Sequence, residues 1–319
     1  MNATLAPTTG PVPPAPRATS ARDAAAIQAV PVPRRGRWVA AALAIGLVAV
    51  LLYALATNDN IKWATVGQYL SDGGILSGLW TTIELTILAM VLGIALGVLS
   101  AVMALSANPV LRGLSLAYTW FFRGTPLLVQ IIFWFNLALL FPHIGVGALD
   151  MKTNSLITPF VAALLGLALN EGAYMSEIVR AGIGAVDRGQ TEAAHALGFS
   201  PRQTMQRIVL PQAMRVIVPP TGNETITMLK NTSLVAVIAA QDLLTRAQAI
   251  YSRTFEVVEL LIVVSIWYLL LTTVASIGQH HLERRFARGF ASTQSEREET
   301  HMWRRITGNL LSRRGGDRR

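Results

Sequence analysis

Six apolar stretches constrain the fold of this chain of 319 residues more than any other feature. They are Trp38–Thr57, Gly78–Leu105, Thr125–Pro142, Leu156–Arg180, Val216–Ala240 and Val257–His280. The first holds 20 residues and would be about 30 Å long as an α-helix, which matches the hydrocarbon core of a bilayer. Because a backbone inside lipid must satisfy its own hydrogen bonds, these stretches predict an all-α integral membrane protein with about six transmembrane helices.

Composition agrees with a chain that is solvated mainly by membrane lipid. Charged residues make up only 14% of it, whereas soluble domains carry about 25%. The net charge of +9 does not indicate a nucleic-acid partner, because the arginines gather at the ends of the apolar stretches and in the terminal segments. The absence of cysteine excludes disulfides and cysteine metal sites, and no metal site is predicted.

The basic residues between the stretches predict which loops are cytosolic. With a cytosolic N-terminus, the inner side receives Arg34, Arg35, Arg37, Arg112, Arg188, Arg202, Arg207, Arg284, Arg285 and Arg288. The opposite loops hold only Lys62, Lys152, Arg246 and Arg253. Positive residues favour the cytosolic side, so the pattern predicts a multi-pass protein with both termini in the cytoplasm.

The two ends of the chain differ from its middle. Residues 1–33 contain seven of the 15 prolines and predict a disordered cytosolic tail. Residues 34–57 predict an extra N-terminal transmembrane helix, and residues 281–319 predict a basic cytosolic C-terminal tail.

A spaced pattern lies in the cytosolic loop between the fourth and fifth stretches. Its fixed residues are Glu192, Ala193, Ala194, Gly198, Ile208, Leu210 and Pro211. Good helix formers precede Gly198, which can end a helix, and Ser200-Pro201 supplies the N-cap and first position of a second helix. The residues alone therefore predict a helical hairpin.

Two polar groups lie on the third and fourth stretches. Thr125 is predicted to cap a helix of about 17 residues that begins at Pro126, with Arg123 at the cytosolic interface. There Arg123 either guards the inner mouth of a pathway or contacts a lipid phosphate. The remaining candidates for a pathway are Asn170, Glu171, Tyr174 and Glu177, because ionisable groups at membrane depth are costly and usually face a cavity or a partner. For Glu177 the alternative is an ion pair with Arg180.

The fifth stretch is the least lipid-like. Its Pro219-Pro220 pair is predicted to break or kink the helix. Its candidate pathway residues are Asn223, Glu224, Thr227, Lys230, Thr232 and Ser233. Lys230 is suited to a substrate carboxylate and Glu224 to a substrate ammonium group. The alternative is an internal Glu–Lys pair that locks a dimer interface.

Longer motifs link these observations. The segment 123–130 reads RGTPLLVQ, residues 173–180 fit A-Y-x-x-E-I-x-R, residues 229–234 read LKNTSL, and the loop pattern reads E-A-A, three residues, Gly, nine residues, I-x-L-P. Together they resemble the permease subunits of polar amino acid ABC importers, the histidine, glutamine, glutamate and arginine branch of the binding-protein-dependent transport inner-membrane component family. The resemblance extends from Gly78 to about Gly289.

The resemblance implies a type I ABC importer transmembrane domain over residues 78–280, in the bacterial cytoplasmic membrane. Residues 181–211 would form the EAA coupling loop, whose fixed residues fit a groove on an ABC ATPase subunit. The implied partners are that ATPase, a second permease subunit (itself or a paralogue) and an extracytoplasmic amino-acid-binding protein. The implied activity is translocation of a polar L-amino acid by alternating access.

Other classes of function have less support in the sequence. The chain has three lysines and none follows a glycine, so it lacks a P-loop and is predicted not to be an enzyme. No cofactor is predicted in this chain, because ATP would be bound by the partner ATPase. A secondary amino acid transporter is the alternative function; it would predict inverted repeats and paired broken helices. A membrane anchor for a signalling complex is a third.

Overall fold

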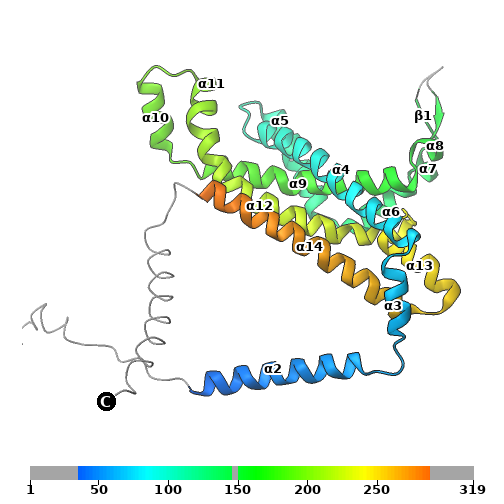
Figure 1. The fold of residues 1–319 in the computed structure, drawn as a ribbon. Coiled ribbons are helices and arrows are strands. Elements are labelled where there is room, and N and C mark those ends of the chain that lie inside the picture. The colour runs from blue at the N-terminus through cyan, green and yellow to red at the C-terminus, as the bar shows by residue number, and fades with distance from the viewer. Residues whose placement is uncertain (1–34, 146–149, 288–319) are drawn as a thin grey trace, which may run out of the picture. The chain divides into compact units, whose positions relative to one another are not determined.

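The computed structural model describes residues 35–145 and 150–287 (Figure 1). It divides between Asn60 and Ile61 into two units, which we describe separately. The predicted tail 1–33 and residues 288–319 of the predicted C-terminal tail lie outside the described residues.

The described part of the first unit is dominated by α2 (Arg35–Ala56), at the position of the predicted extra helix. Its apolar side chains are exposed on every face, among them Leu43, Val50 and Tyr53. A helix that is apolar all round is typical of a membrane span, and its membrane-spanning role stays a prediction. The helix ends where the hydroxyl of Thr57 donates to the carbonyl of Tyr53.

Four long helices form the body of the second unit: α4 (Gly73–Ala104), α9 (Pro159–Gly184), α12 (Leu210–Asn231) and α14 (Val257–Ala287). They run along one another in Figure 1. Within the described residues, the stretches Gly73–Ala104 and Val257–Phe286 are both long and apolar enough to cross a membrane, and Ala40–Ala56 is a shorter apolar helix. The spans predicted on α9 and α12 are helical but carry more polar residues.

Glycines bring α4 close to α9. A Cβ atom added at Gly93 would lie 2.6 Å from Cγ of Glu171, and one at Gly97 would overlap the side chain of Met175. Only glycine permits this approach, so the α4–α9 contact is dense.

The chain between α4 and α9 differs from its prediction. Residues 109–124 form α5 (Pro109–Gly124), which the search for apolar stretches missed. The predicted cap at Thr125 and start at Pro126 are wrong: Thr125 closes α5, and α6 (Leu127–Phe135) has Pro126 as its N-cap. The physical reason is that the Thr125 hydroxyl donates backwards to the carbonyl of Phe121 at 2.9 Å instead of capping the next helix. A break at Asn136 separates α6 from α7 (Leu137–Leu140), so the predicted 17-residue helix is also wrong.

The proline pair does not break α12, which runs through Pro219 and Pro220 without interruption. The side-chain amide of Gln279 on α14 donates to the carbonyl of Pro219 at 3.3 Å. Irregular backbone occurs instead at the ends of α12, in the π-helix η2 (Met205–Val209) and the 3-10 helix η3 (Thr232–Ile238).

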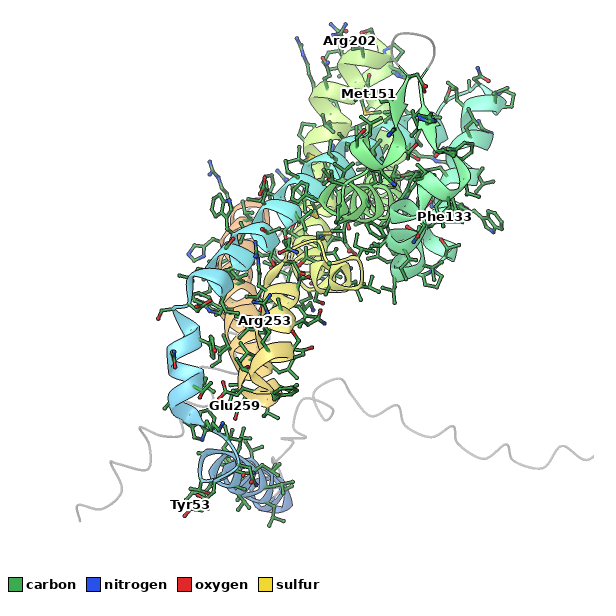
Figure 2. The ribbon with its side chains drawn as sticks, turned by 90° about the vertical axis from the view of Figure 1, so that its right-hand side faces the viewer. Tyr53, Phe133, Met151, Arg202, Arg253 and Glu259 are labelled. Carbon is green, nitrogen blue, oxygen red and sulfur yellow. The ribbon has the colours of Figure 1, made fainter. Side chains whose placement is uncertain are left out.

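Short elements cover the two ends of this bundle. At one end lie α10 (Arg188–Ala196) and α11 (Pro201–Thr204); at the other lie α3 (Trp63–Leu70), α8 (Thr153–Leu156), α13 (Leu243–Thr254) and the antiparallel pair β1 (His143–Ile144) and β2 (Met151–Lys152) (Figure 1). Arg202 and Arg253, labelled in Figure 2, belong to opposite ends. Within the second unit these two arginines therefore separate as the sequence pattern requires, and the sidedness itself stays a prediction.

Candidate functional site

The coupling segment folds as a helical hairpin whose signals are all local. The Asp187 carboxylate accepts from the backbone N–H of Gly189 at 2.7 Å and caps α10. Gly198 follows the helix with φ +80°, a conformation that favours glycine. Ser200 then caps α11 in a reciprocal capping box with Gln203. The predicted helix end and N-cap are confirmed.

The hairpin presents an apolar side chain to the outside. Glu192 and Ala193 are exposed, whereas Ala194 is buried. Leu197, which the spaced pattern does not include, is 77% exposed beside the Gly198 turn. The sequence signal for this exposed side chain was a leucine directly before the glycine that ends the helix.

The remaining pattern residues lie where the hairpin enters α12. Ile208 belongs to the π-helix η2, and Leu210 and Pro211 open α12 with exposed side chains. Pro211 has no N–H, so the preceding carbonyls lack one α-helical donor, and the N–H of Leu210 bonds to Met205 instead. Widened π turns of this kind are frequent at functional sites.

Arg123 lies beside α9 and not at the start of a helix. It occupies the last turn of α5, and its Cζ lies 5.3 Å from the ring centre of Tyr174. Tyr174 lies ten residues before the end of α9, so Arg123 is level with the middle of that helix. The contact with the pathway candidate Tyr174 is a cation–π pair, and the place of Arg123 at the cytosolic interface stays a prediction.

A buried polar knot holds the break between α5 and α6 against α9. The Asn170 amide donates to the carbonyl of Phe122 at 2.8 Å and to Gln130 at 3.3 Å. The Gln130 amide donates in turn to the hydroxyl of Thr125 at 2.7 Å. Asn170 and Thr125 thus have structural bonds, and Gln130 is a residue that the sequence reasoning missed because its role depends on the break.

Glu177 forms an ion pair with Arg180, which is the alternative that the sequence analysis left open. Nε of Arg180 donates to its carboxylate at 3.2 Å across one helical turn. This exposed pair lies near the coupling end of α9.

Glu171 on α9 and Glu224 on α12 are acidic pathway candidates without an ion pair in the described residues. Glu171 is 4% exposed, and its Oε1 has no hydrogen-bond partner in the part of the chain that the structure describes. Glu224 on α12 is half-buried. Among the described residues neither carboxylate forms an ion pair with a lysine or arginine. Within the described residues, two acids on the neighbouring helices α9 and α12 therefore have no cationic partner.

The other candidates on α12 and η3 separate into two groups. Asn223 and Lys230 are exposed and Thr227 is half-buried. Thr232 is fully buried and donates to the carbonyl of Leu229 at 2.6 Å, so it faces the protein core and not a cavity. The hydroxyl of Ser233 donates to the carbonyl of Lys230 at 2.7 Å. Within the described residues Lys230 and Glu224 form no ion pair, so the internal pair proposed as the alternative is absent from a single chain.

A cavity of about 800 Å³ extends from the coupling end of the bundle towards these acids. Its lining comes from α4, α9, α12 and α14 and is mostly apolar, including Val98, Met175, Val179 and Ile217. At its far end it reaches Thr225, the neighbour of Glu224. The cavity therefore lies near the coupling segment and is not lined by Glu171 or Glu224.

Comparison with known proteins places this geometry in a family. Residues 93–288 match the family described as binding-protein-dependent transport system inner membrane component. The chain belongs to this family. It is therefore an integral membrane permease subunit of the ABC importer type, and the matching family is not itself enzymatic.

Individual relatives agree with the family. The chain is 45% identical over 274 residues to the arginine transport system permease protein ArgU of Corynebacterium glutamicum, covering 85% of this chain and 87% of the relative. It is 37% identical over 239 residues to the L-cystine transport system permease protein TcyB of Bacillus subtilis, covering 74% and 96%. Both relatives are permeases of amino acid transport systems, and neither is described as a secondary transporter.

Solved structures give the same architecture. The crystal structure of an amino acid ABC transporter with histidines superposes with a TM-score of 0.60 and 37% identity, covering 66% of this chain and 94% of that one. An inward-facing MetNI methionine ABC transporter matches with a TM-score of 0.55 at 16% identity, covering 67% and 96%, which shows the shared fold alone.

Proposed function

We propose that this permease subunit imports a cationic amino acid, with arginine as the principal substrate. A separate ATPase drives the cycle, and an extracytoplasmic binding protein delivers the substrate. The similarity to ArgU supports the choice of arginine. The observation that carries the proposal is that buried Glu171 has an unpartnered Oε1 and that neither Glu171 nor Glu224 forms an ion pair within the described residues.

Two carboxylates without a cation are costly at membrane depth. Burying an unpaired charge carries a penalty that a bound cation removes. Arginine brings a guanidinium and an α-ammonium group, and a guanidinium matches carboxylates through paired N–H donors. A cationic substrate would thus stabilise the ionised form of both carboxylates.

Lys230 supplies the opposite charge. It is exposed at the end of α12 and has no ion pair in the described chain, so its ammonium group is free to meet a substrate carboxylate. The pathway is completed by a second permease subunit, because the helices of one chain do not enclose a channel. ATP binds the ATPase, and closure of two ATPase subunits draws the coupling hairpins together and opens the cavity outwards.

A substrate panel tests the assignment. The complex, reconstituted in proteoliposomes with its ATPase and binding protein, is given labelled arginine, lysine, histidine, glutamine and glutamate in turn. We expect ATP-dependent uptake of arginine above all others, with lysine next and glutamate lowest. Preferential uptake of glutamine or glutamate would contradict a cationic substrate.

A substitution locates the recognition site. Glu224→Gln keeps the shape of the side chain but removes the charge, so we expect the KM for arginine to rise by about tenfold or more, since a charge-assisted contact contributes about 1.5–3 kcal/mol. Glu84→Gln is the matched control, because Glu84 is an exposed glutamate on α4, away from the two acids. An unchanged KM in Glu224→Gln would exclude this carboxylate from substrate recognition.

A further inference from the structure

The two helices that flank the coupling segment touch at one very close point. A Cβ atom added at Gly182 of α9 would overlap Cγ1 of Ile217, and it would lie 3.0 Å from Cδ1 of that residue and 3.3 Å from the carbonyl of Ala213. Gly184 lies two residues further along α9, and a Cβ atom added there would have nothing within 4 Å. The contact at Gly182 is therefore specific to one position.

This point belongs to a small buried cluster at the edge of the cavity. Ala101, Val179, Ala213 and Ile217 form the cluster and join α4, α9 and α12. Val179 and Ile217 also line the cavity of about 800 Å³. The cluster therefore packs α9 against α12 near the coupling segment.

The contact lies between the hairpin and the carboxylates. The hairpin leaves α9 at Gly184 and returns into α12 at Leu210. Glu171 precedes Gly182 by 11 residues, about 16 Å along a helix, and Glu224 follows Ile217 by seven residues, about 10 Å. Both acids thus lie on helices that this one contact joins.

We propose that Gly182 is a positioning residue that locks α9 to α12, so that a displacement of the coupling hairpin moves Glu171 and Glu224 as one unit. If the contact were loose, one of the two helices would move with the ATPase and the other would not. ATP would then be hydrolysed without the access of the two carboxylates changing from one side of the membrane to the other. The inference rests on the proposed coupling and recognition roles and names the residue that joins them.

The test measures the amount of amino acid imported per ATP hydrolysed by the full complex in proteoliposomes. Gly182→Ala forces the helices apart, and we expect this ratio to fall about fivefold or more, the size of a typical coupling between two sites. Gly184→Ala is the matched control and should keep the wild-type ratio. Ile217→Ala in the Gly182→Ala background removes the overlapping atoms and should restore much of the ratio.

A purely structural role predicts different results. Lower yield of the assembled Gly182→Ala complex with an unchanged ratio would overturn the proposal, as would a lowered ratio that Ile217→Ala does not raise. Ile217→Val provides a second variant that folds normally: it removes Cδ1, and we expect a smaller fall in the ratio, so a wild-type ratio there also counts against the lock.

The result does not depend on the identity of the substrate. The ratio is measured with whichever amino acid the wild-type complex imports, so a wrong substrate assignment leaves the comparison intact. Failure of the wild-type complex to couple any import to ATP would instead contradict the proposed function.

Discussion

At the scale of single residues, glycine fixes two different properties of the coupling region. Gly182 permits a close approach, whereas Gly198 adopts φ +80° in open space. The sequence pattern predicted the second role, since a glycine after a run of helix formers is a common helix end. It could not predict the first, because the neighbour that makes Gly182 special comes from a helix 35 residues further along the chain.

Gly198→Ala should weaken the complex between the permease and its ATPase. A residue with a Cβ pays about 1–2 kcal/mol to adopt a left-handed conformation, so we expect the Kd for the ATPase to rise by about tenfold. Isothermal titration of the detergent-solubilised subunits measures this. Gly184→Ala is the control, because a Cβ atom at that position meets no contact, and it should leave the Kd unchanged. Equal affinities for the wild type and both variants would show that the turn at Gly198 does not shape the docking surface.

At the scale of elements, the sequence predicted the regular helices better than the connections between them. The coupling hairpin follows from local caps, and the long helices follow from apolar length. The helix α5 was missed because its polar residues are buried against other helices: Ser115 and Ser100 share a hydrogen bond of 2.8 Å, and Ser176 donates to Ser100 at 3.0 Å. A search for apolar stretches reads such residues as loop, since their partners are known only from the fold.

The break between α5 and α6 depends on one glutamine. Gln130→Leu should lower the stability of the subunit by about 1–3 kcal/mol, because the carbonyl of Thr125 loses its buried side-chain donor and that of Phe122 keeps only Asn170. We expect a lower Tm of the purified complex in a thermal-shift assay. Gln248→Leu on α13, for which the structure gives no side-chain hydrogen bond within the described residues, is the control. A Tm equal to that of the wild type would mean that the knot does not hold the break.

At the scale of the whole molecule, the distribution of basic residues predicts that the coupling hairpin faces the cytoplasm. The arrangement of the second unit is compatible with this orientation. The hairpin and the β1–β2 end occupy opposite ends of the second unit (Figure 1). Ser200 and Ser155 are exposed at these two ends, and the natural chain has no cysteine that would give background labelling.

Cysteine labelling tests this direction. A cysteine at position 200 should react with a membrane-impermeant thiol reagent only in inside-out vesicles, and one at position 155 should react in intact spheroplasts. The reverse pattern would place the coupling hairpin outside the cell and would contradict its contact with an ATPase.

The central claim is that this chain translocates a cationic amino acid with energy from a partner ATPase. The most direct measurement is uptake of labelled arginine into proteoliposomes that contain the chain, its ATPase and its binding protein, with ATP supplied to the ATPase side. The account predicts accumulation that requires ATP and all three components and that persists when ion gradients are collapsed. Uptake by the chain alone, driven by a proton or sodium gradient and indifferent to ATP, would contradict it.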